Sequence, residues 1–188
     1  MKTASKIFLA AFIIPLVISG CSCSKNNTSN IADFQIKERE DVKDAVRDWV
    51  VFTNPAYRYE LRSPKDWTIS DVNKDGEDVR FYPEKNAITE DYLGDLRILG
   101  YTNWQEHLPL DEFIKTKAVN NYYQMSNAAD REELEFRGYY AMRFKNVELK
   151  KDQFIDVIVV DTKDSIVAIE LHGSYDVLTN IISSMYFY

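Results

Sequence analysis

The segment from Phe154 to Val160 constrains the fold most strongly, because it is an almost continuous run of apolar residues. A strand with one face in water alternates polar and apolar residues, whereas a strand buried on both faces shows a continuous apolar run. The run therefore predicts a central strand of a sheet.

Further strand signals surround this run. Residues 57–61 alternate aromatic or aliphatic with charged residues, which is typical of a half-buried strand. Asp75-Gly76 is a strong hairpin signal, and Val79 and Phe81 alternate with polar residues directly after it. Strands are also expected at residues 49–52, 67–69, 96–101, 140–144 and 166–171. Short hairpins between neighbouring strands favour antiparallel pairing.

Apolar residues at helical spacing predict helices at three places. The clearest pattern runs from Leu110 to Met125 and begins with acidic residues. A second stripe runs from Val177 to Met185, and a short amphipathic helix is expected within residues 37–48. The order of strands, helix, strands and helix predicts an α+β fold, in which an antiparallel β-sheet is covered by helices.

The first 20 residues have the order of an export signal. Lys2 and Lys6 accompany an apolar stretch, residues 7–18, which is shorter than the roughly 20 residues of a membrane-spanning helix. Ile18-Ser19-Gly20-Cys21 then resembles the lipobox of bacterial lipoproteins. The resemblance implies cleavage before Cys21, lipid on its sulfur and often a further acyl chain, such as palmitate, on the new amino terminus. The alternative is an ordinary signal peptide with an incidental cysteine.

This reading divides the chain into three parts. Residues 1–20 are the expected lipoprotein signal peptide, residues 21–36 a flexible lipid-anchored tether, and residues 37–188 a single globular domain. The expected location is the cell envelope, with attachment to a membrane through the lipid. Ser22 resembles the outer-membrane default of enterobacterial sorting, which places the domain on the periplasmic face of the outer membrane if the organism is Gram-negative.

The start of the domain resembles that of PsbP-like bacterial domains. The resemblance rests on residues 49–54, on 57–61 and on Pro64-Lys65-Asp66-Trp67, with helices expected near the same positions. It covers roughly residues 49–188 and implies a PsbP-like α/β/α sandwich with Trp67 in the core. In that superfamily most members act as binding or assembly modules.

Charge and cysteine content narrow the possible functions. The 188-residue chain has a net charge of −7, and removal of Lys2 and Lys6 with the signal lowers it to −9. Such a chain repels nucleic-acid phosphates, so no nucleic-acid partner is expected. Its two cysteines, Cys21 and Cys23, both precede the domain, which leaves no internal disulfide and no thiolate metal site.

Few residues suggest a metal site or catalysis. The loop from Asp71 to Gly76 resembles the first half of a calcium loop, but Tyr82 stands where a bidentate Glu is needed, so a solvated hairpin turn is expected. His107 and His172 each lack a neighbouring Cys or second His. The acidic residues between 130 and 135 are expected to form a solvated face. No catalytic, metal or cofactor residue is predicted.

These observations predict a membrane-tethered envelope lipoprotein that acts as a non-catalytic binding or assembly module. Its expected partner is a protein or another envelope component, of unknown identity. The alternative is an envelope enzyme or glycan-binding protein that acts on a cell-wall or extracellular polymer, since twelve tyrosines and three tryptophans could supply an exposed aromatic patch.

Overall fold

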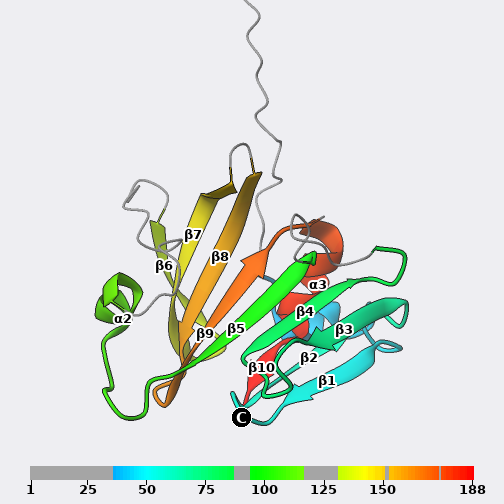
Figure 1. Cartoon of the computed structure of the whole chain (residues 1–188). Coiled ribbons are helices and arrows are strands. Elements are labelled where there is room, and N and C mark those ends of the chain that lie inside the picture. Colours follow the sequence, from blue (N-terminus) through cyan, green and yellow to red (C-terminus); the bar gives the residue numbers. More distant parts are fainter. Residues whose placement is uncertain (1–35, 87–93, 117–130, 151–152, 174) are drawn as a thin grey trace, which may run out of the picture. The chain divides into compact units, whose positions relative to one another are not determined.

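The computed structural model describes residues 36–86, 94–116, 131–150, 153–173 and 175–188. Within residues 31–188, which form one compact unit, the described elements are mostly antiparallel strands (Figure 1). Their bounds, in chain order, are α1 (Arg39–Val42), β1 (Val50–Asn54), β2 (Tyr59–Ser63), β3 (Trp67–Asp71), β4 (Asp78–Pro83), β5 (Leu96–Thr102), α2 (Leu110–Thr116), β6 (Arg131–Phe136), β7 (Tyr139–Lys150), β8 (Gln153–Asp161), β9 (Ser165–Leu171), α3 (Tyr175–Ser184) and β10 (Tyr186–Phe187).

The strands form two sheets. The larger has seven strands in the order β3-β4-β5-β9-β8-β7-β6, and the smaller has three in the order β1-β2-β10. Every pairing is antiparallel. The apolar run ends up in β8, between β9 and β7, so the prediction of a central strand is confirmed.

The two faces of the larger sheet pack against different partners. One face shares a core with β2 and α3, which we call the inter-sheet core and which includes Tyr59, Phe81, Ile158 and Leu178. The opposite face packs against α2 in a second core that includes Phe113 and Val157. Both faces of β8 are thus buried, which is why its sequence lacks polar alternation.

The helices are fewer and shorter than the sequence predicts. α3 matches the predicted C-terminal helix, whereas α1 covers only four residues of the predicted range 37–48. α2 confirms the start of the predicted helix at Leu110, and residues 117–125 of that prediction lie outside the described residues. The second sheet was not predicted, so the fold is a sandwich of sheets with few helices rather than one sheet covered by helices. Among the described residues, no helix combines the length and apolarity needed to cross a membrane.

Trp67 packs against the inter-sheet core but is only partly buried, and it also lines a shallow cavity with Pro83 and Val177. Its backbone N–H donates to the Pro64 carbonyl at 3.1 Å, which closes the turn into β3. Trp67 therefore packs on the core, as predicted, but its side chain is only partly buried.

Trp67→Ala is expected to lower the free energy of unfolding by about 2–3 kcal/mol, below the roughly 3–5 kcal/mol of a fully buried tryptophan. Urea unfolding of a fragment spanning residues 31–188 measures the change. Trp104→Ala is the matched control, because Trp104 is 57% exposed and its removal should change little. Equal stability of the Trp67 variant and the parent would show that Trp67 contributes nothing to the core.

Candidate functional site

A cavity of about 500 Å³ lies beside the C-terminal half of β5, and we call it the β5 cavity. This volume is within the usual range for small-molecule sites. Five segments line it: the β3–β4 loop, the start of β4, β5, the loop that follows β5, and α2. The lining residues are Asn73, Glu77, Asp78, Arg97, Leu99, Gly100, Tyr101, Thr102, Asn103, Gln105, Glu106, Leu108 and Phe113.

A row of charged side chains crosses three strands at one side of this cavity. Arg80 in β4 is directly opposite Arg97 in β5, and Arg97 is directly opposite Glu170 in β9. Two like charges facing each other across neighbouring strands repel, so this row needs a carboxylate next to the arginine pair.

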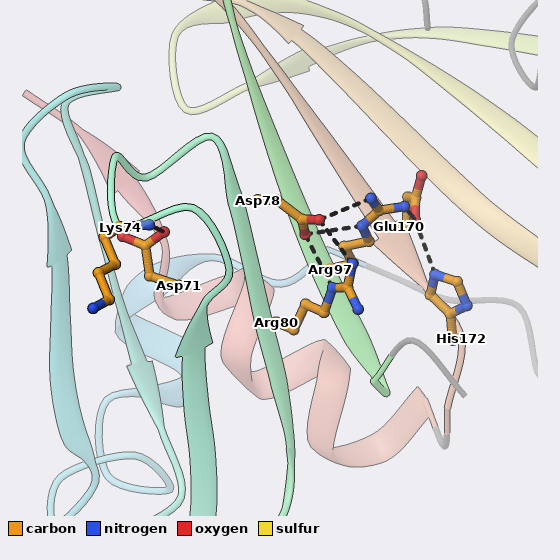
Figure 2. A network of polar contacts seen from close by, with 7 residues as sticks. All are labelled: Asp71, Lys74, Asp78, Arg80, Arg97, Glu170 and His172. Carbon is orange, nitrogen blue, oxygen red and sulfur yellow. Dashed lines mark hydrogen bonds and ion pairs between the residues drawn. The ribbon is translucent and has the colours of Figure 1, made fainter. Parts of the chain in front are cut away.

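Asp78 supplies that carboxylate, as Figure 2 shows. Its oxygens accept hydrogen bonds from Nε and Nη2 of Arg97 at 3.0 and 2.9 Å, and from Nε and Nη2 of Arg80 at 3.2 and 2.8 Å. Burial by itself would raise the pKa of the Asp78 carboxyl, but the hydrogen bonds and charges of Arg97 and Arg80 outweigh it and lower that pKa. Asp78 therefore stays ionised and fixes both guanidinium groups.

The other end of the row is held by Glu170, whose side chain is 1% exposed. Its Oε2 atom accepts from Nη1 of Arg97 at 3.4 Å and contacts Nε2 of His172 at 3.1 Å. Arg97 thus donates to two carboxylates at once (Figure 2).

The loop after β5 owes its shape to one buried amide. The Asn103 side chain exchanges two hydrogen bonds with the backbone of Leu108, both at 3.0 Å. The backbone carbonyl of Asn103 accepts from the His107 N–H at 2.8 Å. These bonds close a compact loop that brings Gln105, Glu106 and Leu108 to the cavity.

The β3–β4 loop is held in a similar way. Asp71 accepts from the backbone N–H groups of Lys74 and Gly76 at 2.9 and 3.1 Å, and Gly76 has a φ of 79° that favours glycine. The Asn54 side chain donates to the Gly76 carbonyl at 3.0 Å, and the Gly100 N–H donates to the Glu77 carbonyl at 2.9 Å. The position of Glu77 is therefore fixed by backbone contacts on both sides of the loop.

Aliphatic and aromatic side chains complete the lining. Phe113 and Tyr101 meet edge to face, with ring centroids 5.5 Å apart, and both belong to or pack against the α2-side core with Leu99 and Leu108. Burial raises the pKa of the Tyr101 hydroxyl, and the charge of Glu170 raises it further, so this phenol remains a neutral donor at physiological pH.

Sequence analysis correctly identified the loop Asp71–Gly76 as a hairpin turn. Both Asp71 carboxylate oxygens accept backbone N–H groups, and the Lys74 ammonium points away from the Asp78 network (Figure 2). Among the described residues, no group of three or more His, Cys, Asp and Glu is placed to hold a metal ion.

The histidines and the acidic segment occupy different environments. His107 is exposed, whereas His172 is partly buried at the end of β9 against Glu170. Glu132, Glu133 and Glu135 are exposed on the edge strand β6, as predicted for a solvated face. Cys21, Cys23 and Asp130 lie outside the described residues.

The sequence analysis did not identify Asp78, Arg97 or Glu170 as site residues. Asp78 and Arg97 occupy the polar positions of alternating strands, and such positions normally face solvent. Glu170 is the one acidic residue in the apolar stretch of β9. The two arginines and two carboxylates lie on segments that were predicted as strands, but only the strand order and register bring them into one row.

Comparison with known proteins gives limited similarity. No protein-family model matches the chain, and no curated protein matches it. A crystal structure of a protein from Bacteroides thetaiotaomicron is similar with a TM-score of 0.47 and 11% identity, and the match covers 73% of this chain and 48% of that one. The solution structure of cyanobacterial PsbP (CyanoP) from Synechocystis is similar with a TM-score of 0.46 and 17% identity, over 74% of this chain and 92% of that one.

Proposed function

We propose that this chain is a membrane-tethered, non-catalytic binding module of the cell envelope, and that the β5 cavity is its ligand site. The observation that carries the proposal is the cavity itself, whose walls are fixed by buried polar contacts from Asp78, Asn103 and Asn54. Small-molecule sites are mostly preformed in this way.

The chemistry of the lining favours binding over catalysis. No Ser, Cys, Lys or His lines the cavity among the described residues, so a nucleophile or base of these types has no support there. Asp78 does not suit the acid of a glycosidase, which needs a raised pKa, because its pKa is lowered and both of its oxygens accept hydrogen bonds from arginines.

The finer fold assignment, a PsbP-like α/β/α sandwich, belongs to the same proposal. In its support, α3 packs on one face of the seven-stranded sheet and α2 on the other. The Pro64–Trp67 turn into β3 is one of the three segments on which the sequence resemblance rests.

Blocking the cavity tests the binding function. Thr102 is an exposed residue at the cavity, so Thr102→Trp should fill the opening without disturbing either core. Thr53→Trp is the matched control, because Thr53 is also an exposed strand residue and lies outside the cavity lining.

Each variant is purified from its native membrane and denatured, and the released small molecules are identified by mass spectrometry. We expect at least one compound to be enriched with the parent and with Thr53→Trp but lost with Thr102→Trp. Identical profiles for all three proteins, or no enriched compound with any of them, would contradict the cavity as the ligand site.

Tethering at Cys21 is the second part of the proposal. It is supported by the order of positive charge, short apolar stretch, small residues and cysteine over residues 1–21. Two acyl chains give stable anchoring, whereas one gives only marginal binding. The domain would then stand close to the membrane on a tether of about fifteen residues, 21–36.

Cys21→Ser is expected to leave an unprocessed precursor without lipid, because the thiol is the attachment atom. Cys23→Ser is the matched control and should be processed and acylated like the parent. Intact mass spectrometry of the three proteins decides, and normal acylation of the Cys21 variant would refute this anchor.

A further inference from the structure

We infer that the β5 cavity takes a small organic cation, an ammonium or guanidinium group on an apolar body. This inference rests on the proposed function, which makes the cavity a ligand site. It adds the chemical class of the ligand. It follows from the charges of the lining, from its aromatic residues and from the hydrogen bonds that Arg97 already makes to two carboxylates.

The lining has an excess of negative charge. Glu77, Asp78 and Glu106 are its acidic residues and Arg97 is its basic residue, which gives a formal charge of −2. Arg80 and Glu170, which form ion pairs with Asp78 and Arg97, carry opposite charges, so together they do not change this sum. A cation entering the cavity therefore meets a favourable field, and an anion an unfavourable one.

Arg97 does not reverse this preference. Its Nε and Nη2 atoms donate to Asp78, and its Nη1 atom donates to Glu170, so all three guanidinium nitrogens already face carboxylates. An anion placed against Arg97 would also approach both of those carboxylates. Arg97 is consequently a structural partner of Asp78 and Glu170 rather than an anion receptor.

The apolar part of the lining suits the body of such a ligand. Leu99 and Leu108 offer aliphatic surface, and Tyr101 and Phe113 offer aromatic rings. Aromatic faces attract cations electrostatically, and the attraction grows when water is excluded. The exposed carboxylate of Glu77 lies on a loop whose backbone is fixed, so its charge remains near the opening.

Three probes of similar size and different charge test the inference: phenethylammonium, 2-phenylethanol and 3-phenylpropionate. Their binding to the full chain in a non-ionic detergent is measured by calorimetry at low ionic strength. We expect the ammonium to bind in the millimolar range or tighter, the alcohol more weakly and the carboxylate weakest. Added salt should weaken the ammonium selectively.

Charge variants locate the effect. Glu77→Gln should weaken the ammonium by roughly 3- to 5-fold and leave the alcohol unchanged, since a partly exposed ion pair contributes little more. Glu135→Gln, an exposed carboxylate on β6, should leave all three affinities unchanged. Thermal unfolding confirms that each variant is folded.

The outcomes distinguish a wrong ligand class from a wrong binding site. If the carboxylate binds as tightly as the ammonium, or if the ammonium does not bind in the millimolar range, the inference is overturned. If probes bind the parent but not Thr102→Trp, the β5 cavity is supported as the binding site, whatever the order of the probes' affinities. If Thr102→Trp binds the probes like the parent, the cavity is not where they bind, and the proposed function fails with the inference.

Discussion

Asp156→Ala is expected to lower the free energy of unfolding by about 3–5 kcal/mol, the usual cost of breaking a buried ion pair by removing one partner. Asp156 accepts a hydrogen bond of 2.6 Å from Nη2 of Arg143, with the two side chains 2% and 7% exposed. In the Asp156→Ala variant the guanidinium of Arg143 remains buried but loses the Asp156 carboxylate that balances its charge.

Asp156 has a second structural contact. Its Oδ1 atom accepts from the backbone N–H of Asn146 at 3.2 Å, where β7 carries a register irregularity between Phe144 and Val147. Asn146 has a φ of 54°, an uncommon conformation for a residue other than glycine. The carboxylate therefore stabilises the bulge as well as the arginine.

Urea unfolding of the fragment spanning residues 31–188 measures the effect. Asp164→Ala, which removes an exposed carboxylate in the β8–β9 turn, is the matched control and should stay within about 0.5 kcal/mol of the parent. The double variant Arg143→Met/Asp156→Leu should be more stable than Asp156→Ala, because it removes both charges and keeps the volume filled. A single variant as stable as the Asp164 control would show that this pair does not hold β7 to β8.

Asp156 also shows how far the sequence predicts the sheet. The run from Phe154 to Val160 predicts a central strand because its other residues are apolar, and this is confirmed. The partner of the one acidic residue in the run cannot be predicted in the same way. Arg143 is on the neighbouring strand, directly opposite Ile158 rather than Asp156, and the register between the two strands shifts after Phe144.

The second sheet escaped prediction for a different reason. β1 and β2 were expected as strands, but β10 has only two residues, Tyr186 and Phe187, which is too short for any periodic pattern. Its pairing with Tyr59 and Glu60 is determined by where α3 ends after packing on the inter-sheet core. Tertiary packing, rather than local sequence, therefore determines that the fold is a sandwich of sheets and not one sheet covered by helices.

The candidate site was predictable only in part. The turn at Asp75-Gly76, the alternation that follows it and a strand at residues 96–101 were all expected from local sequence, so the strands that carry Asp78 and Arg97 were expected. Their convergence was not, because alternating polar residues are ordinarily solvated. The structural role of Asn103 could not be predicted either, since an asparagine in a loop is normally interpreted as a surface turn residue.

Asp78→Asn is expected to lower the free energy of unfolding by about 2–4 kcal/mol at neutral pH, because hydrogen bonds to charged groups are strong and the loss leaves two arginines opposed. The Asp78 side chain is 11% exposed, and those of Arg80 and Arg97 are 14% and 16% exposed, so water screens the three charges incompletely. The amide of Asn keeps the shape of the side chain but removes the charge that holds the arginines in one row with Glu170.

The pH dependence of this difference has a definite sign. The pKa of Asp78 is lowered in the folded chain, whereas an unfolded Asp has a pKa of about 3.9. A depressed folded pKa contributes stability that is present above the unfolded value and is lost as pH falls through the folded value. The stability gap between parent and Asp78→Asn should therefore be constant above about pH 5 and should narrow below about pH 4, where Asp78 of the unfolded parent binds a proton while the folded carboxyl is still ionised. Urea unfolding of both proteins between pH 7 and pH 3 measures the gap, with Asp164→Asn as the exposed-carboxylate control. A gap that stays the same down to pH 3 would mean that Asp78 is not the charge that balances Arg80 and Arg97, and the fixed wall of the β5 cavity would then need another origin.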